Sequence, residues 1–315
     1  EYYNDLLIFK NGECLFQILD FLDSENPLLR HLSKSWLDQS LKQYKKMVDP
    51  ILKCLLDENI QILQGEKFYE IEKEYNAKIL MDSFRRLKNL IINSPMMNFL
   101  IKNKPDDDII EIFKNKKFFF INKDEINYFY MLISISLIYT QGQCNPNLSS
   151  SFKKINLSIN ATSCEFLEFL LSHVNNPDII MTCAKNINFP ILLLIDKALD
   201  DINKNNVMQV QLLSLLKVLY FRTSSVHLKY KADALSLFGS QNLINCLSKG
   251  MTRDYYFVRE NYINFIRECL PLFKNIMNDE VGKKTYYKLG GTFILALAVN
   301  LSRKISIDTI GKIGR

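Results

Sequence analysis

Apolar residues recur along this chain every three or four positions. In the run over residues 14–22, Leu15, Leu19 and Leu22 fall on one face of a helix, and a polar segment at 23–25 follows. Because an α-helix repeats every 3.6 residues, this spacing predicts a helix that buries one side. The same pattern predicts further helices in the first half, from residue 27 onward, over about 44–63, over about 67–93 and over about 124–140.

The second half repeats this pattern with short polar breaks. Candidate breaks are the segment 175–177, Phe189-Pro190, Gly239 and Gly250. Antiparallel helix pairs joined by short Asn, Asp or Pro turns are typical of an α-solenoid. We therefore expect an all-α fold, an α-solenoid of divergent HEAT- or armadillo-like helix pairs without a strict period. The helices expected here cover about 162–174, 178–187, 190–203, 206–222, 232–249, 255–277 and 283–308.

The best linker candidate is the segment 142–160, which combines Asn-Pro, a run of three serines and a Lys-Lys pair. Such clusters interrupt periodic segments. The sequence predicts N-terminal helical repeats over 1–141, a linker or trimmed loop over 142–160 and a second block of repeats over 161–315. The chain opens at Glu1 within an apparent helical pattern, which favours an internal fragment of a longer protein.

Two positions predict where the second helix begins. Asn26 is a favourable N-cap, and Pro27 suits the first helical turn, where its missing N–H costs nothing. We expect Trp36 to be a core anchor between repeats. The residues expected on the core-facing side of this helix are Leu28, Leu29, Leu32, Trp36 and Leu37.

Two turns resemble each other and the HEAT-repeat turn. Each places an acidic residue, Asp23 or Asp254, before a helix. Each then places an arginine, Arg30 or Arg259, about one turn inside that helix. In the HEAT turn the aspartate caps the helix and the arginine ties successive repeats together, and the resemblance implies these roles here.

Composition agrees with a helical protein. The chain has 315 residues, of which 48% are hydrophobic, so it can bury a continuous core. Only 10 glycines and 8 prolines are present, which disfavours all-β folds because their many turns need such residues. The net charge of +6 is a mild excess, smaller than nucleic-acid binders usually concentrate on one face.

The reactive residues favour a protein without an active site. The seven cysteines are scattered without any C-x-x-C pair, which indicates neither a zinc site nor disulfides and favours a reducing, cytoplasmic compartment. With only His31, His173 and His227, acid–base chemistry near neutral pH would need strongly shifted carboxylates or lysines. The acidic run 106–108 fits an N-cap and first helical turn. We therefore expect no enzyme activity, no cofactor, no metal and no small-molecule substrate.

One basic–aromatic segment has two interpretations. Lys114, Lys116, Lys117 and Phe118 could contact an anionic membrane surface or nucleic acid. The alternative is a solvated turn followed by a core segment, and we favour it. The longest apolar runs, 128–139 and 293–301, are shorter than the roughly 20 residues that span a bilayer.

The segment 26–61 reads NPLLRHLSKSWLDQSLKQYKKMVDPILKCLLDENIQ. It resembles the Dopey family of giant helical-repeat trafficking proteins. Its matching elements are Arg30, Ser35-Trp36-Leu37, Asp49-Pro50-Ile51-Leu52 and Leu55-Leu56-Asp57. The long helix over 74–91 also looks like a family segment, and 209–221 and 259–273 are similar in style.

This resemblance implies a non-enzymatic scaffold for protein–protein interaction, peripheral on Golgi or endosomal membranes. Its partners would be other subunits of a large complex, namely a Golgi protein related to Arf exchange factors and a P-type lipid flippase. Auxiliary subunits of the neuronal sodium leak channel are similar solenoids. An adaptor of another complex, such as a channel, cytoskeletal or ciliary assembly, therefore stays open. Nucleic-acid binding would require one continuous basic groove from Lys42, Lys46, Arg85, Arg86, Lys116 and Lys117.

Overall fold

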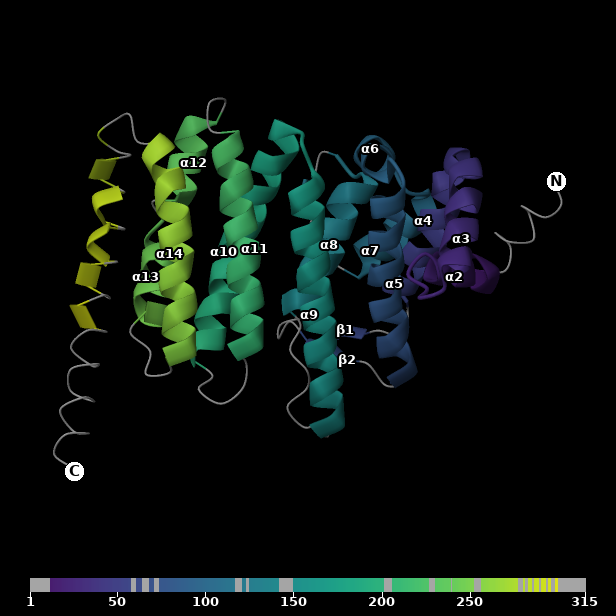
Figure 1. Ribbon diagram of the computed structural model, residues 1–315, viewed down its shortest axis with the longest axis horizontal. Coiled ribbons are helices and arrows are strands. Elements are labelled where there is room, and N and C mark those ends of the chain that lie inside the picture. The colour runs from purple at the N-terminus through teal and green to yellow at the C-terminus, as the bar shows by residue number, and fades with distance from the viewer. Residues whose placement is uncertain are drawn as a thin grey trace. The chain divides into compact units, whose positions relative to one another are not determined.

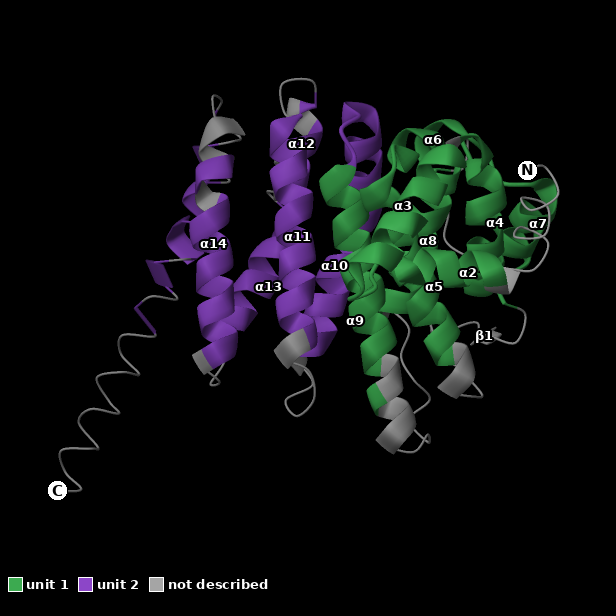
Figure 2. Cartoon of the chain, turned by 45° about the vertical axis from the view of Figure 1, so that its right-hand side comes forward, with its two compact units in different colours: residues 1–173 green, residues 174–315 purple. Residues whose placement is uncertain are grey.

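The computed structural model divides the chain into two compact units, residues 1–173 and residues 174–315 (Figure 2). The predicted all-α fold is confirmed for the described residues, apart from one short hairpin. The residues described are 12–57, 61–63, 68–70, 74–116, 121–122, 125–141, 150–200, 206–226, 230–238, 240–251, 256–276 and scattered positions between 280 and 299.

Unit 1 holds eight α-helices, one 3-10 turn and the hairpin in its described part (Figure 1). Its elements are α2 (Gly12–Phe21), α3 (Pro27–Gln39), η1 (Leu41–Gln43), α4 (Tyr44–Leu55), β1 (Gln61–Leu63), β2 (Phe68–Glu70), α5 (Glu74–Asn93), α6 (Met96–Lys102), α7 (Asp107–Asn115), α8 (Tyr128–Gln141) and α9 (Ser150–His173).

In its described part, unit 2 has scattered helical positions between 280 and 299 and five continuously described helices, of which α10, α11 and α14 run side by side (Figures 1 and 2). They are α10 (Pro177–Asp200), α11 (Asn206–Ser225), α12 (Lys231–Phe238), α13 (Gln241–Met251) and α14 (Tyr256–Ile276).

Helix α5 forms the centre of unit 1, because it packs against α4 on one side and α9 on the other. Its apolar stripe is buried, with Leu80, Phe84 and Leu87 at most 1% exposed. The Phe84 ring lies 5.3 Å from the ring of Phe166 on α9 and 6.0 Å from that of Tyr139 on α8, measured between centroids. Aromatic pairs at such distances add to the free energy gained from burial.

Helix α8 confirms the prediction of a buried helix over about 124–140. Nearly all of its side chains are buried, including those of two serines and one threonine. Ser134, Ser136 and Thr140 each donate to the backbone carbonyl four residues earlier, at 2.7–2.9 Å. The helix therefore satisfies these three buried hydroxyls with its own backbone; left unpaired, they would destabilise the core.

The helix expected over 44–63 ends early, at Leu55, and the next begins at Glu74 rather than at 67. Between them lies an antiparallel hairpin in which Gln61 pairs with Glu70 and Leu63 with Phe68. Ile62, Phe68 and Tyr69, half of the strand residues, are β-branched or aromatic, which favours extended backbone over helix. Helical spacing of apolar residues was therefore the wrong criterion for this short segment.

The predicted linker is also partly wrong. Residues 150–160 are the first turns of α9, which packs against both α5 and α8, while 142–149 lie outside the described residues. Buried Ile159 shows why this serine-rich segment is helical, since the apolar side of α9 continues into it. The boundary between the two compact units falls after residue 173 of the chain, outside 142–160.

Helix α3 departs from its predicted core face. Asn26 caps it as expected, accepting from the Leu28 backbone N–H at 2.9 Å, and Pro27 occupies the first turn. Leu37 is buried, but Leu28 and Leu32 are 61% and 55% exposed. The main neighbours of α3 are α2 and η1, so only one side of the helix is covered in the described residues.

Helix α10 continues without interruption through Phe189-Pro190, where a break was expected. Proline removes one backbone hydrogen bond, but Ile187, Ile191 and Ile195 stay buried on both sides of it, where α10 packs against α11 and α13. Residues 177–199 are long and apolar enough to cross a membrane by length and composition, and 56% of their apolar 18-residue window is buried within the structure. The burial accounts for its apolar sequence.

The expected helix over 232–249 is two helices, α12 and α13, and Gly250 lies inside α13 rather than at a break. Gly250 lets α13 approach α14 closely. A Cβ atom at this position would lie 2.4 Å from the ring of Tyr262, which is fully buried. The close approach therefore requires glycine for steric reasons, although the backbone is helical.

We predict that Gly250→Ala lowers the free energy of unfolding by about 1–2 kcal/mol, because overpacking outweighs the higher helix propensity of alanine. Gly291→Ala is the matched control, since a Cβ there meets nothing within 4 Å. Chemical denaturation of both variants checks this. Equal stabilities for the two variants would contradict the steric role of Gly250.

Candidate interaction surface

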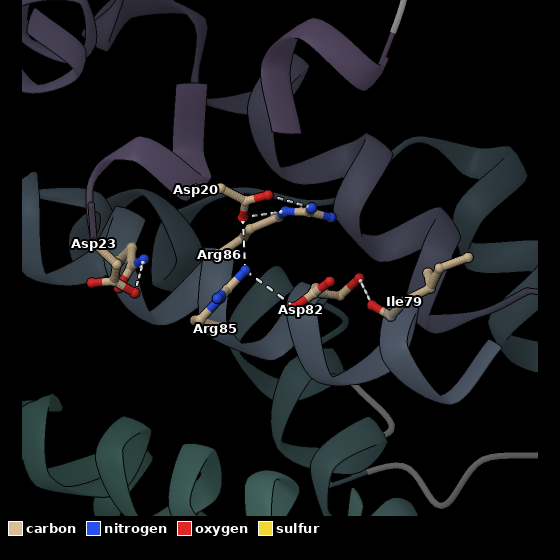
Figure 3. A network of polar contacts seen from close by, with 8 residues as sticks. Asp20, Asp23, Ile79, Asp82, Arg85 and Arg86 are labelled. Atoms are coloured by element: carbon tan, nitrogen blue, oxygen red, sulfur yellow. Dashed lines mark hydrogen bonds and ion pairs between the residues drawn. The ribbon is translucent and has the colours of Figure 1, made fainter. Parts of the chain in front are cut away.

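A network of charged side chains joins α2 to α5 (Figure 3). Arg86 donates from Nε and Nη2 to the two carboxylate oxygens of Asp20, at 2.8 and 2.7 Å. Arg85 donates to the same carboxylate at 3.1 Å and also contacts Asp82 at 3.1 Å. The bidentate geometry at Arg86 is the stronger arrangement of the two.

The network is anchored on both sides of Arg86. Its guanidinium lies 4.4 Å from the centroid of the Phe16 ring, and its side chain is only 12% exposed. One turn further along α5, the Asn89 amide donates to Asp23 at 2.6 Å. Asp20 and Asp23 thus hold the end of α2 against the polar side of α5.

A groove of about 270 Å³ lies beside this network, between α5 and α9. The rings of Phe84 and Phe166, both nearly fully buried, form its floor. Its lining residues are Met81, Asp82, Phe84, Arg85 and Lys88 from α5, and Thr162, Glu165 and Phe166 from α9.

The groove combines an apolar floor with a charged rim. Arg85 and Lys88 supply positive charge on the α5 side, and Glu165 supplies a carboxylate on the α9 side. Arg85 is held in place by Asp20 and Asp82, and the Lys88 ammonium lies 5.8 Å from the centroid of the Phe169 ring. An apolar hollow edged by oriented charges suits a side chain or short segment of a partner.

The residues predicted for the first repeat turn make local contacts. Arg30 donates to the backbone carbonyls of Ser24 and Glu25, the latter at 3.1 Å, so it braces its own turn. Asp23 accepts from Asn89 of α5 instead of capping α3. Trp36 is half-buried rather than fully enclosed. The HEAT resemblance implies that this arginine connects successive repeats. The contacts of Arg30 lie within its own turn instead.

The second predicted turn is only partly described. Asp254 lies outside the described residues. Arg259 is half-buried in the first turn of α14, next to buried Val258.

The predicted basic–aromatic segment is also only partly described. Lys114 is exposed in the last turn of α7. The Lys116 ammonium donates to the backbone carbonyl of Asp57. Lys117 and Phe118 lie outside the described residues. Among the cations proposed for a basic groove, Arg85, Arg86 and Lys116 thus bind acidic or carbonyl groups of this chain.

The described cysteines are free thiols. Burial raises the pKa of the thiols of Cys246 and Cys269 to about 12, and it raises the pKa of Cys164 and Cys183 further. A thiol is a poor nucleophile until it ionises, so these four are suited to packing. His173 lies at the end of α9, with Nδ1 2.9 Å from the Phe169 carbonyl.

Comparisons with protein-family models, with curated proteins and with solved structures found no match.

The sequence indicated parts of this surface but not the whole. A charged run such as residues 85–88 on an amphipathic helix is typical of a solvated face, whereas Arg86 is largely buried against Asp20. The groove itself joins residues about 80 positions apart, and no local spacing signals it. Asp20 was the one sequence signal for the charged network, because it is an acidic residue on α2, away from the side that carries the buried leucines.

We predict that Arg86→Ala lowers the free energy of unfolding by about 1–3 kcal/mol, because it removes a bidentate contact in a part-buried site. Arg85→Ala should cost less than about 1 kcal/mol, since its side chain is 47% exposed. Urea denaturation measures the free energy of unfolding of both variants. Asp20→Ala, which removes the carboxylate that both arginines contact, completes the comparison. The prediction is wrong if Arg85→Ala is the more damaging substitution.

Proposed function

We propose that this chain is a non-enzymatic scaffold that binds other proteins, built as an α-solenoid of divergent HEAT- or armadillo-like helix pairs. Helices adjacent in sequence pack together within each unit, as α8 does with α9 and α10 with α11. Such near-neighbour packing is typical of helical repeats, which leave long helix faces free for partners.

The observation that carries this proposal is the groove between α5 and α9. Its floor is apolar, its rim is charged, and the polar network with Asp20 fixes one wall. A partner helix or extended segment could insert an apolar side chain over Phe84 and Phe166 and place polar groups near Lys88 and Glu165. Interfaces of this kind have an apolar centre and a polar rim.

Two lines of chemistry support a binding role over catalysis. The four buried cysteines have raised pKa values, which favours neutral thiols. In the groove, the Asp82 carboxylate contacts Arg85, which suits a structural carboxylate better than a general base.

Filling the groove should abolish partner binding. Thr162→Trp places a large ring between the walls, and Ser158→Trp, one turn earlier on α9, is the matched control. Both hydroxyls only bond the carbonyl four residues earlier in their own helix, so both substitutions lose the same contact. We expect quantitative crosslinking in cells to show partners lost with Thr162→Trp and kept with Ser158→Trp.

Equal partner sets for the two tryptophan variants would argue against the groove as the binding site. Thermal denaturation of both variants separates loss of binding from loss of folding. If the two melting temperatures are similar, a loss of partners in Thr162→Trp alone reflects the filled groove and not unfolding.

The narrower proposal is a scaffold on Golgi or endosomal membranes, and it rests on the resemblance of residues 26–61 to the Dopey family. Affinity purification of the full-length protein from its own cells tests it. We expect recovery of a lipid flippase and a Golgi scaffold subunit. Recovery of channel, cytoskeletal or ciliary subunits would favour the alternative, an adaptor or auxiliary subunit of another complex.

A further inference from the structure

An aspartate is buried where α4, α7 and α8 meet in unit 1. Asp49 of α4 is 9% exposed, and the hydroxyl of Tyr128, the first residue of α8, donates to its Oδ1 at 2.5 Å. The carboxyl group of Asp106, directly before α7, lies within hydrogen-bonding reach of Asp49. A buried carboxyl group is thus brought next to a half-exposed one, since the Asp106 side chain is 55% exposed.

The charges around Asp49 come from all three elements. Lys45 and Lys53, one turn before and after it on α4, form ion pairs with Asp106 and Asp108. Asp107 adds another carboxylate in the first turn of α7. With every acid ionised, four carboxylates face two lysines, and Tyr128 supplies only a neutral hydroxyl.

Both lysines are already paired with acids of the α7 end. The Lys45 ammonium contacts Asp106, and Lys53 lies 3.0 Å from Asp108. An ionised Asp49 therefore faces a like-charged Asp106, and its own burial leaves little water to stabilise its charge. A protonated Asp49 can donate to Asp106 while it still accepts from Tyr128, so the neutral form fits the site better.

We propose that protonation of Asp49 closes a latch that holds the start of α7 against α4 and α8. In the closed state, the Asp49 hydroxyl donates to Asp106 and the two lysine pairs are kept. In the open state, repulsion between Asp49 and Asp106 loosens α7, which carries the exposed Lys114. The latch makes the anchoring of this helix sensitive to pH.

Burial, followed by the nearby Asp106, raises the pKa of Asp49 to about 6, although the Tyr128 hydrogen bond opposes the shift. An unfolded aspartate has a pKa of about 3.9. The folded state therefore binds the proton more tightly, and stability from this group is complete below about pH 4. That stability is lost as pH rises through about 6, so acidification from neutral pH closes the latch.

Hydrogen exchange on the full 315-residue chain tests the latch. After correction for the intrinsic exchange rate, we expect the opening equilibrium of the α7 amides to fall by about tenfold from pH 7.5 to pH 5.0. Asp49→Asn should remove this pH response, because the amide can donate to Asp106 and accept from Tyr128 at every pH.

Asp108→Asn is the matched control from the same cluster. The ion pair with Lys53 lowers the pKa of Asp108 below its usual value, so it stays ionised throughout this range. The control should lose one ion pair and keep the tenfold response. A wild-type chain whose α7 opening does not change with pH, or an Asp49→Asn variant that keeps the response, would overturn the proposal.

A second variant covers the case in which Asp49→Asn fails to fold. Tyr128→Phe removes the hydroxyl that favours ionised Asp49, so the midpoint of the α7 response should move to higher pH. An unchanged or lower midpoint in Tyr128→Phe would likewise contradict the latch.

Discussion

Burial of the apolar face of α5 is the interaction on which unit 1 depends. Leu80, Phe84 and Leu87 fill the space between α4 and α9, and the Phe84 ring meets aromatic rings from both α8 and α9. Each of these side chains gains free energy by leaving water, and tight packing fixes the spacing between helices. The polar side of the same helix is thereby positioned to meet α2.

The charged groups of α5 follow from this placement. Because the apolar face is fixed, Arg86 must lie beside Asp20 and Phe16, and Arg85 must lie at the edge of the groove. The groove is the gap that remains where α5 and α9 present polar residues above the Phe84–Phe166 pair. A similar principle operates in unit 2, where Lys249 of α13 contacts Asp196 of α10 at 2.7 Å along the margin of a buried interface.

The junction of α4, α7 and α8 shows a different balance. There a carboxyl group is enclosed instead of being left at the margin, and Tyr128 and Asp106 become its neighbours. Lysines outside the junction are paired with the acids of α7, so they do not fully compensate Asp49. Ion pairs at the margin of a helix contact therefore hold helices together at any pH near neutral. The enclosed Asp49 instead makes the contact of α7 with α4 and α8 depend on its own protonation.

The sequence by itself determined the all-α class and the helices with a strong apolar signal. Burial of one side gives α5 a regular apolar period, and burial on nearly all sides gives α8 a continuous apolar run. It also determined the start of α3, since Asn26 and Pro27 act through the local backbone. Only the tertiary structure decided the hairpin at 61–70, the helical state of 150–160 and the exposure of Leu28 and Leu32, because these depend on which neighbours are present. The groove and the Asp49–Asp106 pair also depend on the tertiary structure, because each brings together side chains from separate segments of the chain. The spacing of residues within one segment carries no information about such contacts.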